Sequence, residues 1–366
     1  MLGIALIDLG RFEEAAACLH EAVAASPDNS AFRRALATAL ERGGDAAAAA
    51  STLAEAVVDL PANVELRTAG IMVEMRRRAF AKAAALAEQA RREGAIDACV
   101  MGLMGHALSS LGRHADAASA YREALKLGPE DPYVRHLVAA AGVLPQATRA
   151  PKAYLETVFD GYASRFEAHL ISLGYRAPGL LRAALLAHLP PSDKGTQIGP
   201  VLDLGCGTGL VGVVLSDLEL GGLVGVDASN RMLDEARRKG LYSELVHGDL
   251  ESMLHISTNT WPIVMAADVL CYFGALDGVM KAVHARLLPG GLFLFTVEEL
   301  AVEDADCPPW QLGRQGRYAH RQEHITLSAA AAGFRVVELR QEILRYEADA
   351  PVGGLLAVMQ RVRHDG

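Results

Sequence analysis

The stretch VLDLGCGTGLVGVVL, Val201–Leu215, places a glycine-rich turn between two apolar runs. The first run ends soon after Asp203, and three glycines then occupy alternate positions, Gly205, Gly207 and Gly209. Glycines at such a turn remove side chains, so the backbone can turn sharply and approach a ligand closely. The stretch therefore predicts a strand, a ligand-binding loop and a helix in succession.

After this stretch, apolar runs alternate with helical stretches to the end of the chain. Strands that alternate with helices predict a mostly parallel sheet covered by helices on both faces. In such sheets, ligands bind at the carboxyl ends of the strands near the topological switch point. The further predicted strands are LVGV (223–226), ELV (244–246), IVMAA (263–267), LFLFTV (292–297), RVVEL (335–339) and GLLAVMQ (354–360).

The spacing of the glycines narrows the kind of ligand. The dinucleotide fingerprint GxGxxG would need a glycine at position 210, where the chain has Leu210. The spacing here is GxGxG, preceded by an acid two residues earlier. This resembles motif I of the class I S-adenosylmethionine-dependent methyltransferases. The resemblance implies a Rossmann-like α/β domain with a seven-stranded, mostly parallel sheet.

The later motifs of that family follow in order. LVGVDAS ends a strand in a carboxylate that would take both ribose hydroxyls, and LVHGDLES follows the next strand, where the family contacts the adenine. IVMAADVLCYFG then supplies the motif beside the methionine part of the cofactor and the substrate. Each acid alone could be only a helix cap. With the lid described next, the resemblance implies these residues for binding S-adenosylmethionine and its product S-adenosylhomocysteine: Tyr162, Asp203, Gly205, Cys206, Gly207, Asp227, Ala228, Asp249, Leu250, Ala267 and Asp268.

The segment VFDGYASRFEAHLISLGYRAP, residues 158–178, resembles the helical lid of methyltransferases related to the ubiquinone/menaquinone type. By this resemblance Tyr162 would reach the methionine end of the cofactor. The alternative is that the aromatic side chains only pack the lid, and we favour this for two of them, Phe159 and Phe166. The signature is matched by Phe159, Asp160, Tyr162, Ala163 and Phe166, whereas Glu167 replaces its second aspartate.

The first 140 residues are rich in alanine and repeat with a period of 34 residues, which resembles the tetratricopeptide repeat. We expect an all-α solenoid over residues 1–144, with about four repeats, the first truncated, and a capping helix. The loop at 142–151 would join it to the methyltransferase domain at 152–366, whose lid spans 152–189. The aligned columns are Ala15, Ala49, Ala83 and Ala117; Ala22, Ala56, Ala90 and Ala124; Pro27, Pro61 and Pro129; and Gly10, Gly44 and Gly112, with Ala95 and Arg78 as the exceptions in the last two.

Three side chains are candidates for the general base that an oxygen, carbon or charged-amine acceptor would need. His320 lies in the region that usually covers the substrate, Tyr272 follows the fourth strand, and Glu298 ends the fifth. A surface or hydrogen-bonded histidine explains His320 equally well. Neighbouring cationic and aromatic residues could form a pocket for a carboxylate or phosphate, or simply a solvated loop: Arg314, Arg317, Tyr318 and Arg321.

Composition excludes several other classes. The net charge of −9 argues against a protein that holds nucleic acid by charge. Five cysteines without a CxxC pair indicate reduced thiols and no metal site. We expect neither a signal peptide nor a membrane span, and a cytoplasmic location. ADVLCYFG lacks the Asn/Asp-Pro-Pro-Tyr/Phe of enzymes that methylate adenine or amide nitrogens, which disfavours those substrates.

Three functional hypotheses remain. The chain could methylate an O, N or C nucleophile of a small molecule, which could be carrier-bound or acidic. Alternatively, it could methylate a protein or peptide recruited by the repeats. A third hypothesis is a non-catalytic scaffold that binds S-adenosylmethionine. The repeats would bind a protein partner or associate with themselves in a homodimer. The methyl acceptor cannot be named from the sequence.

Overall fold

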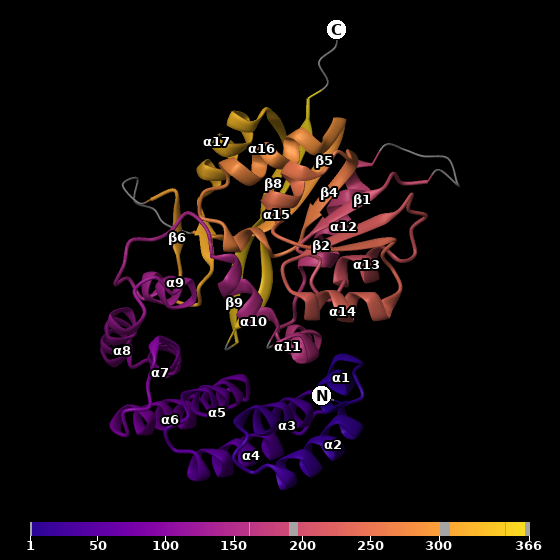
Figure 1. Ribbon diagram of the computed structural model, residues 1–366. Coiled ribbons are helices and arrows are strands. Elements are labelled where there is room, and N and C mark those ends of the chain that lie inside the picture. Colours follow the sequence, from indigo (N-terminus) through magenta and orange to yellow (C-terminus); the bar gives the residue numbers. More distant parts are fainter. Residues whose placement is uncertain (1, 161, 190–196, 301–307, 348, 363–366) are drawn as a thin grey trace. The chain divides into compact units, whose positions relative to one another are not determined.

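The computed structural model describes residues 2–160, 162–189, 197–300, 308–347 and 349–362 (Figure 1). The chain divides into two compact units, Met1–Pro145 and Gln146–Gly366. The first unit is all helical. The second contains the sheet with its helices. Each unit is described below by itself.

The first unit consists of antiparallel helix pairs, which confirms the tetratricopeptide-like pattern. Alanines of the first column face the inside of these pairs: Ala15, Ala49, Ala83 and Ala117 are all at most 2% exposed. Their small side chains let the paired helices approach closely. The helices are α1 (Leu2–Asp8), α2 (Phe12–Ala25), α3 (Ser30–Arg42), α4 (Ala46–Asp59), α5 (Val64–Arg76), α6 (Phe80–Arg92), α7 (Ala98–Ser110), α8 (His114–Leu127) and α9 (Pro132–Ala140).

The glycine column marks the turn within each helix pair. Gly10, Gly44 and Gly112 adopt φ of 75°, 97° and 74°, in the left-handed region that favours glycine. Arg78, the exception in this column, takes the same conformation with φ of 60°. The turn geometry is therefore kept in the third pair even where the side chain makes it unfavourable.

A repeated arginine contact connects the two helices of a pair with the link that precedes them. Arg33 is buried, and it donates to the carbonyl of Pro27 (2.6 Å) and pairs with Asp59 (2.6 Å). One period later, Arg67 donates to the carbonyl of Pro61 (2.7 Å) and pairs with Glu93. The proline column thus supplies carbonyl acceptors to these arginines, in addition to ending helices.

The second unit holds a nine-stranded sheet in the order β3-β2-β1-β4-β5-β7-β6, with β9 pairing both β5 and β8. The prediction of seven strands is therefore wrong by two. All seven predicted strands are present, and the short hairpin β6–β7 is added. The strands are β1 (Val201–Leu204), β2 (Leu223–Asp227), β3 (Glu244–His247), β4 (Trp261–Ala266), β5 (Leu287–Glu299), β6 (Trp310–Leu312), β7 (Tyr318–His320), β8 (Phe334–Glu347) and β9 (Ala350–Arg361).

The added hairpin lies beyond the carboxyl end of β4. Strand β9 occupies one edge of β5 along residues 292–298, and β4 occupies the other edge along 292–295. Strand β7 pairs with Glu298 and Glu299, so it must continue the β4 edge past the end of β4. This places β6 and β7 at the sheet edge where parallel sheets bind ligands. The strands β6 and β7 have three residues each, which is too short for apolar periodicity to reveal them in the sequence.

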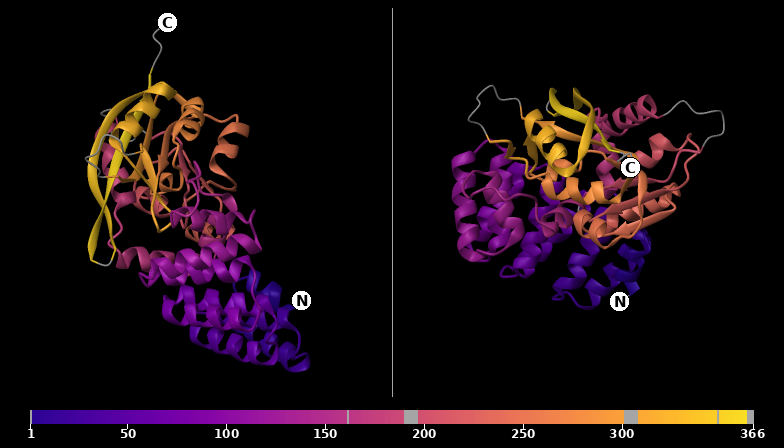
Figure 2. Two further views of the ribbon diagram at one scale, coloured as in Figure 1. Left: turned by 90° about the vertical axis from the view of Figure 1, so that its left-hand side faces the viewer. Right: turned by 90° about the horizontal axis from the view of Figure 1, so that it is seen from above.

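Helices cover both faces of the sheet, as expected (Figure 2). The helical elements of this unit are α10 (Lys152–Asp160), η1 (Ala163–Arg165), α11 (Phe166–Ser172), α12 (Ala177–His188), α13 (Leu210–Leu215), α14 (Asn230–Lys239), α15 (Leu250–Ile256), η2 (Leu270–Tyr272), α16 (Asp277–Arg286) and α17 (Gln322–Ala332). Neighbouring residues of a strand belong to separate cores: Leu202 of β1 and Phe293 of β5 lie in the core under α15–α17, while Val201 and Leu292 lie in the core under α12 and α13.

Over the described parts of the chain, every helix falls short of the length and apolar character that crossing a bilayer requires.

Candidate active site

The glycine turn between β1 and α13 adopts the conformation that its sequence predicts. Gly205, Gly207 and Gly209 have φ of 65°, 53° and 92°. A Cβ added at Gly205 would lie 2.3 Å from Cγ2 of Val269, so this position has no room for a side chain. A Cβ added at Gly207 would find only Phe166, at 3.8 Å. The loop therefore combines a tightly packed first glycine with an open second one.

Asp227 connects this loop to the end of β2. Its Oδ2 accepts the backbone N–H of Gly207 (2.9 Å), and its Oδ1 accepts the backbone N–H of Ser229 (2.8 Å). Burial raises the pKa of Asp227, although both hydrogen bonds favour its ionised form. Ala228 accepts a hydrogen bond from His247 (2.8 Å), which gives this histidine a structural partner. Each carboxylate oxygen of Asp227 keeps a further lone pair for a hydroxyl donor.

Asp249 is held by a residue that the sequence did not single out. Its Oδ1 caps α15 by accepting the backbone N–H (3.1 Å) and hydroxyl (2.9 Å) of Ser252. Its other oxygen pairs with Arg149, which also pairs with Glu251 and lies over the ring of Phe273. Arg149 belongs to the loop predicted only as a linker, and a lone arginine in a loop carries no pattern that could have identified it. Leu250, beside Asp249, is buried.

Residues 146–151, which include Arg149 and are called the strap here, run along the edge of the sheet formed by the carboxyl ends of the strands. Ala150 donates to the carbonyl of Tyr272 (2.8 Å), and the carbonyl of Thr148 accepts from Gly274 (2.8 Å) and Ala275 (2.9 Å). The hydroxyl of Tyr318, on β7, donates to the carbonyl of Ala147 (2.7 Å). This part of the predicted linker is therefore bound to the second unit.

Two acids hold the lid against α14. Asp160, at the end of α10, accepts the hydroxyl of Ser229 (2.6 Å). Glu167, on α11, pairs with Lys239 (2.6 Å), whose ammonium also donates to the carbonyl of Thr208 (2.7 Å). Glu167 thus anchors the lid with the carboxylate that replaces the aspartate of the resembled signature.

The lid aromatics pack mainly on one another. Phe159 lies edge-on to Phe166 and to Tyr272, with ring centres 6.2 and 5.6 Å apart. Tyr162 lies edge-on to Phe166 and His169, both at 5.6 Å. These contacts favour the packing interpretation for Phe159 and Phe166.

A buried charge cluster occupies the carboxyl ends of β4, β5 and β8. Arg345 is only 1% exposed, and it pairs with Asp268 (3.2 Å), Glu298 and Glu347 (2.8 Å). Arg317 pairs with Glu298 (2.7 Å) and Glu347. Two arginines thus face three carboxylates, and neither has a spare charge for an acidic ligand. Burial raises the pKa of Asp268, whose backbone has φ of 56° and donates to Thr296.

The three candidate bases differ in their surroundings. His320 is fully buried, stacks on His324 at 5.5 Å, and has a pKa lowered to about 3, first by burial and then by His324. It is therefore a weak proton acceptor at pH 7. Tyr272 has a pKa well above its ordinary value because it is buried. Glu298 is held by the two arginines of the charge cluster. The structure gathers Tyr272 and Glu298 at one sheet edge with the cofactor candidate Asp268. The catalytic roles of His320, Tyr272 and Glu298 stay predictions.

We expect His320 to make the protein less stable in mild acid. Its folded pKa lies below the value of about 6.5 in an unfolded chain, so the unfolded state binds the extra proton. Stability is therefore complete above pH 6.5 and declines as the pH falls toward 3, by up to about 1.4 kcal/mol per pH unit. Urea unfolding between pH 6.5 and 4.5 should show a smaller slope for His320→Gln than for wild type. The control is His255→Gln, at an exposed histidine, which should keep the wild-type slope. Equal slopes for wild type and His320→Gln would contradict the prediction.

The remaining cofactor candidates lie along the same loop and strand ends. Cys206 is buried, its pKa is well above the ordinary value because of burial, and it lies two residues after the end of β1. Burial therefore disfavours its thiolate form. Ala267 is partly buried and follows β4. Among the described residues, no group of three or more His, Cys, Asp or Glu is placed to hold a metal ion.

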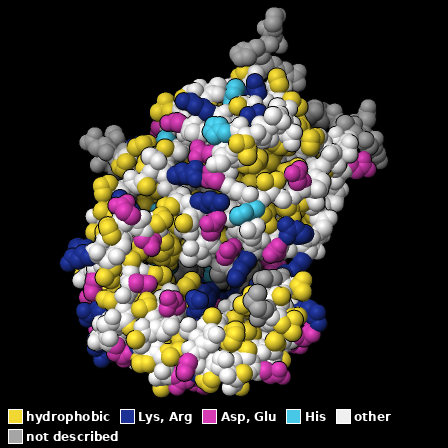
Figure 3. Space-filling view, in the orientation of Figure 1, with side chains coloured by type: hydrophobic (Ala, Val, Ile, Leu, Met, Phe, Trp, Pro, Cys, Tyr) yellow, Lys and Arg dark blue, Asp and Glu magenta, His cyan; other side chains and the backbone are white. Residues whose placement is uncertain are grey.

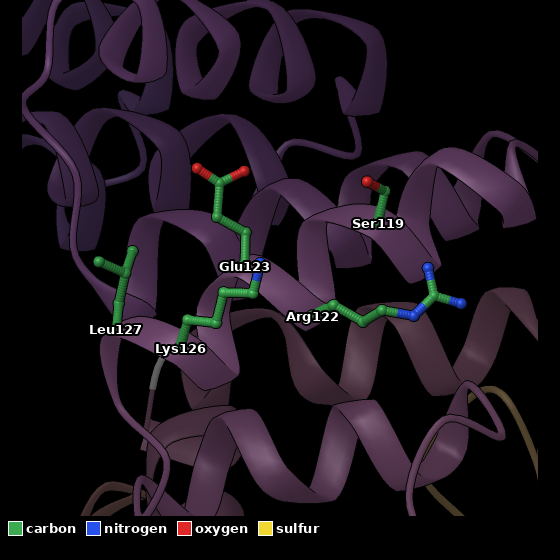
Figure 4. A pocket seen from close by; sticks show the side chains of 5 residues that line it. All are labelled: Ser119, Arg122, Glu123, Lys126 and Leu127. Atoms are coloured by element: carbon green, nitrogen blue, oxygen red, sulfur yellow. The ribbon is translucent and has the colours of Figure 1, made fainter.

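Charges elsewhere on the protein are mixed. On the face seen in Figure 3, basic and acidic side chains alternate rather than gather into one basic patch. In the repeat unit, Arg76, Arg77 and Arg91 pair with acids of their own or a neighbouring helix. Figure 4 shows a hollow lined by one face of α8, which belongs to the repeat unit and not to the site above. Its lining residues are Ser119, Arg122, Glu123, Lys126 and Leu127.

Comparison with protein families agrees with both units. Residues 201–291 match the family model of a methyltransferase domain, and residues 1–64, 70–132 and 103–141 match that of the tetratricopeptide repeat. Residues 201–291 therefore belong to a methyltransferase domain, and the unit that contains them has the class I methyltransferase fold. The chain joins this domain to an N-terminal array of tetratricopeptide repeats.

Individual relatives cover parts of the chain. Human methyltransferase-like protein 27 is 36% identical over 114 residues, which are 31% of this chain and 43% of that protein. The structure of an S-adenosylmethionine-dependent methyltransferase from Mesorhizobium loti aligns with 49% of this chain and 96% of its own, at 22% identity and a TM-score of 0.38. A Burkholderia thailandensis 1,6-didemethyltoxoflavin-N1-methyltransferase, with bound 1,6-didemethyltoxoflavin and S-adenosylhomocysteine, aligns with 60% of this chain and 93% of its own, at 19% identity and a TM-score of 0.45.

Proposed function

We propose that the chain is an S-adenosylmethionine-dependent methyltransferase that acts on a small-molecule acceptor. The observation that carries the proposal is the half-buried carboxylate of Asp227, which lies at the end of β2 and accepts a hydrogen bond from the glycine loop. Its orientation is fixed by the N–H groups of Gly207 and Ser229. A carboxylate with free lone pairs beside a side-chain-free loop suits a ligand that offers a ribose diol.

The residues present fit this cofactor on two further observations. Gly205, Gly207 and Gly209 leave the loop backbone bare, and Asp203 has a buried carboxylate oxygen with no hydrogen-bond partner among the described residues. When bound, S-adenosylmethionine supplies a methyl group on a positively charged sulfur, which an acceptor can take by in-line displacement. The protein then has to hold the reactants in line and keep water away, which can contribute roughly 7–11 kcal/mol.

The covering of the sheet edge supports a small acceptor. The lid α10–α11 is tied to α14, and the strap at 146–151 and the hairpin β6–β7 cross the ends of β4 and β5. Such covering helps to exclude water, and it favours a compact ligand over a folded polypeptide. The three carboxylates around Arg345 outnumber the two arginines that pair with them, so the cluster offers no unpaired positive charge that would favour an acidic acceptor.

The cofactor site can be tested with Asp227→Ala. We expect this change to weaken S-adenosylmethionine binding by about 1.5–3 kcal/mol, the range for hydrogen bonds to a charged group, or roughly tenfold or more. Isothermal titration calorimetry would measure the affinity. Asp234→Ala removes an exposed carboxylate of α14 and should leave it unchanged. Equal affinities for Asp227→Ala and wild type would show that the ribose contact is elsewhere.

The acceptor can be sought with methyl-tritiated S-adenosylmethionine and a lysate of the source organism. The expected result is enzyme-dependent label in the small-molecule fraction, which Asp227→Ala reduces. Label in protein would instead favour the repeats as a substrate-recruiting arm. No label in either fraction, with the cofactor bound, would favour a non-catalytic scaffold.

A further inference from the structure

The ring of Tyr242 packs against three glycines that belong to three different elements. It lies between α14 and β3, a place that the sequence did not single out. A Cβ added at Gly209, Gly212 or Gly225 would come within 3.0, 2.8 and 2.9 Å of atoms of the tyrosine ring. Gly209 ends the glycine loop, Gly212 lies in α13, and Gly225 lies in β2. These positions are therefore small partly because this ring packs against them.

The hydroxyl of Tyr242 bridges the two elements that flank the glycine loop. It donates to Oδ2 of Asp203, at the end of β1, over 2.7 Å. It also accepts the backbone N–H of Gly212, in the first turn of α13, over 3.2 Å. A single hydroxyl thus connects the strand before the loop with the helix after it.

The ionised form of Asp203 depends on this hydrogen bond, because the carboxylate has few other hydrogen-bond donors. Its side chain is completely buried, and within the described residues its Oδ1 has no hydrogen-bond partner. Burial raises its pKa to about 7, the hydroxyl of Tyr242 lowers it, and Asp227 of β2 raises it. The other titratable groups that interact with it are Cys206 of the loop and Tyr175, which precedes α12. Its charge therefore depends on a single side-chain donor near neutral pH.

We propose that Tyr242 is a positioning residue for the cofactor, which acts through Asp203 and Gly212 to hold the glycine loop in its binding conformation. This inference rests on the proposed function, because it concerns the same cofactor site. An ionised carboxylate directly before the loop attracts a ligand that carries positive groups, as S-adenosylmethionine does. Loss of the hydroxyl removes a hydrogen bond that favours the ionised form of Asp203.

The test compares wild type, Tyr242→Phe and Asp203→Asn in the full chain. Calorimetric titration with S-adenosylmethionine from pH 6 to 8.5 gives the affinity and the pH midpoint of its decline. In wild type we expect the affinity to fall as the pH drops through about 7. In Tyr242→Phe we expect about tenfold weaker binding at pH 7 and a midpoint raised by about one pH unit. Asp203→Asn should remove this pH dependence, and Tyr242→Phe added to it should have a smaller effect.

Controls separate this role from a merely structural one. Tyr242→Phe keeps the ring that packs on the glycines, and its thermal midpoint shows whether the fold is kept. Tyr346→Phe removes a hydroxyl from an exposed tyrosine and should bind as wild type does. Two results for Tyr242→Phe would overturn the inference alone. One is an equal loss of affinity at every pH, with the pH midpoint of binding unchanged, and the other is no loss of affinity. Wild type that binds no S-adenosylmethionine would overturn the proposed function together with it.

Discussion

Arg345→Met is expected to lower the free energy of unfolding of the second unit by about 3–5 kcal/mol, the range for breaking a buried ion pair from one side. Methionine keeps much of the side-chain volume but removes the charge that faces Asp268, Glu298 and Glu347. Arg317 alone would then balance three carboxylates in a place where water has little access. Differential scanning calorimetry should show this as a lower transition temperature.

The matched control lies on the same strand. Arg340, also on β8, pairs with Glu338 and Glu342, but its side chain is 42% exposed. Exposed pairs are worth about 0–1 kcal/mol, so Arg340→Met should hardly move the transition. The repeat unit serves as an internal reference, since the two units need not unfold together. Similar shifts for the two variants would show that the cluster at Arg345 is not held as the structure describes.

Gly205→Ala is expected to destabilise the same unit by about 2–5 kcal/mol and to abolish most cofactor binding. An alanine at φ of 65° costs about 1–2 kcal/mol. Its Cβ would also lie 2.3 Å from Cγ2 of Val269. Overpacking of this kind adds about 1–3 kcal/mol, and the branched valine has little freedom to move aside. Thermal unfolding and titration with S-adenosylmethionine would measure both effects.

Gly240 supplies a control with the same backbone conformation. Its φ is also 65°, at the C-terminal cap of α14, but an added Cβ meets nothing within 4 Å. Gly240→Ala should therefore cost only the conformational part, about 1–2 kcal/mol, and should leave cofactor binding intact. If Gly205→Ala were no worse than Gly240→Ala, the close packing of the loop against Val269 would be refuted.

The sequence predicts the position of Asp268 but not the residues that bind it. Motif order predicted its place at the end of β4, but not that Arg345, nearly eighty residues later, would bind it. The expected pocket for a carboxylate or phosphate included Arg317, and the structure pairs this arginine with two acids instead. The position of His320 in the covering region makes it a candidate base, and only the structure shows that it is buried against His324. Charge pairing across distant strands leaves no local periodicity from which it could be inferred.

The helical repeats, the α/β domain and the glycine loop can all be predicted from the amino-acid sequence, because they depend on local rules. A 34-residue period, alternating apolar runs and the GxGxG spacing act through backbone conformation and through the side chains next to them in the chain. Only the folded structure reveals the hairpin β6–β7, the strap with Arg149, the charge cluster at Arg345 and the contact between Tyr242 and Asp203. Each of these brings together residues far apart in the chain, and the burial that sets their charge and energy exists only once the sheet has assembled.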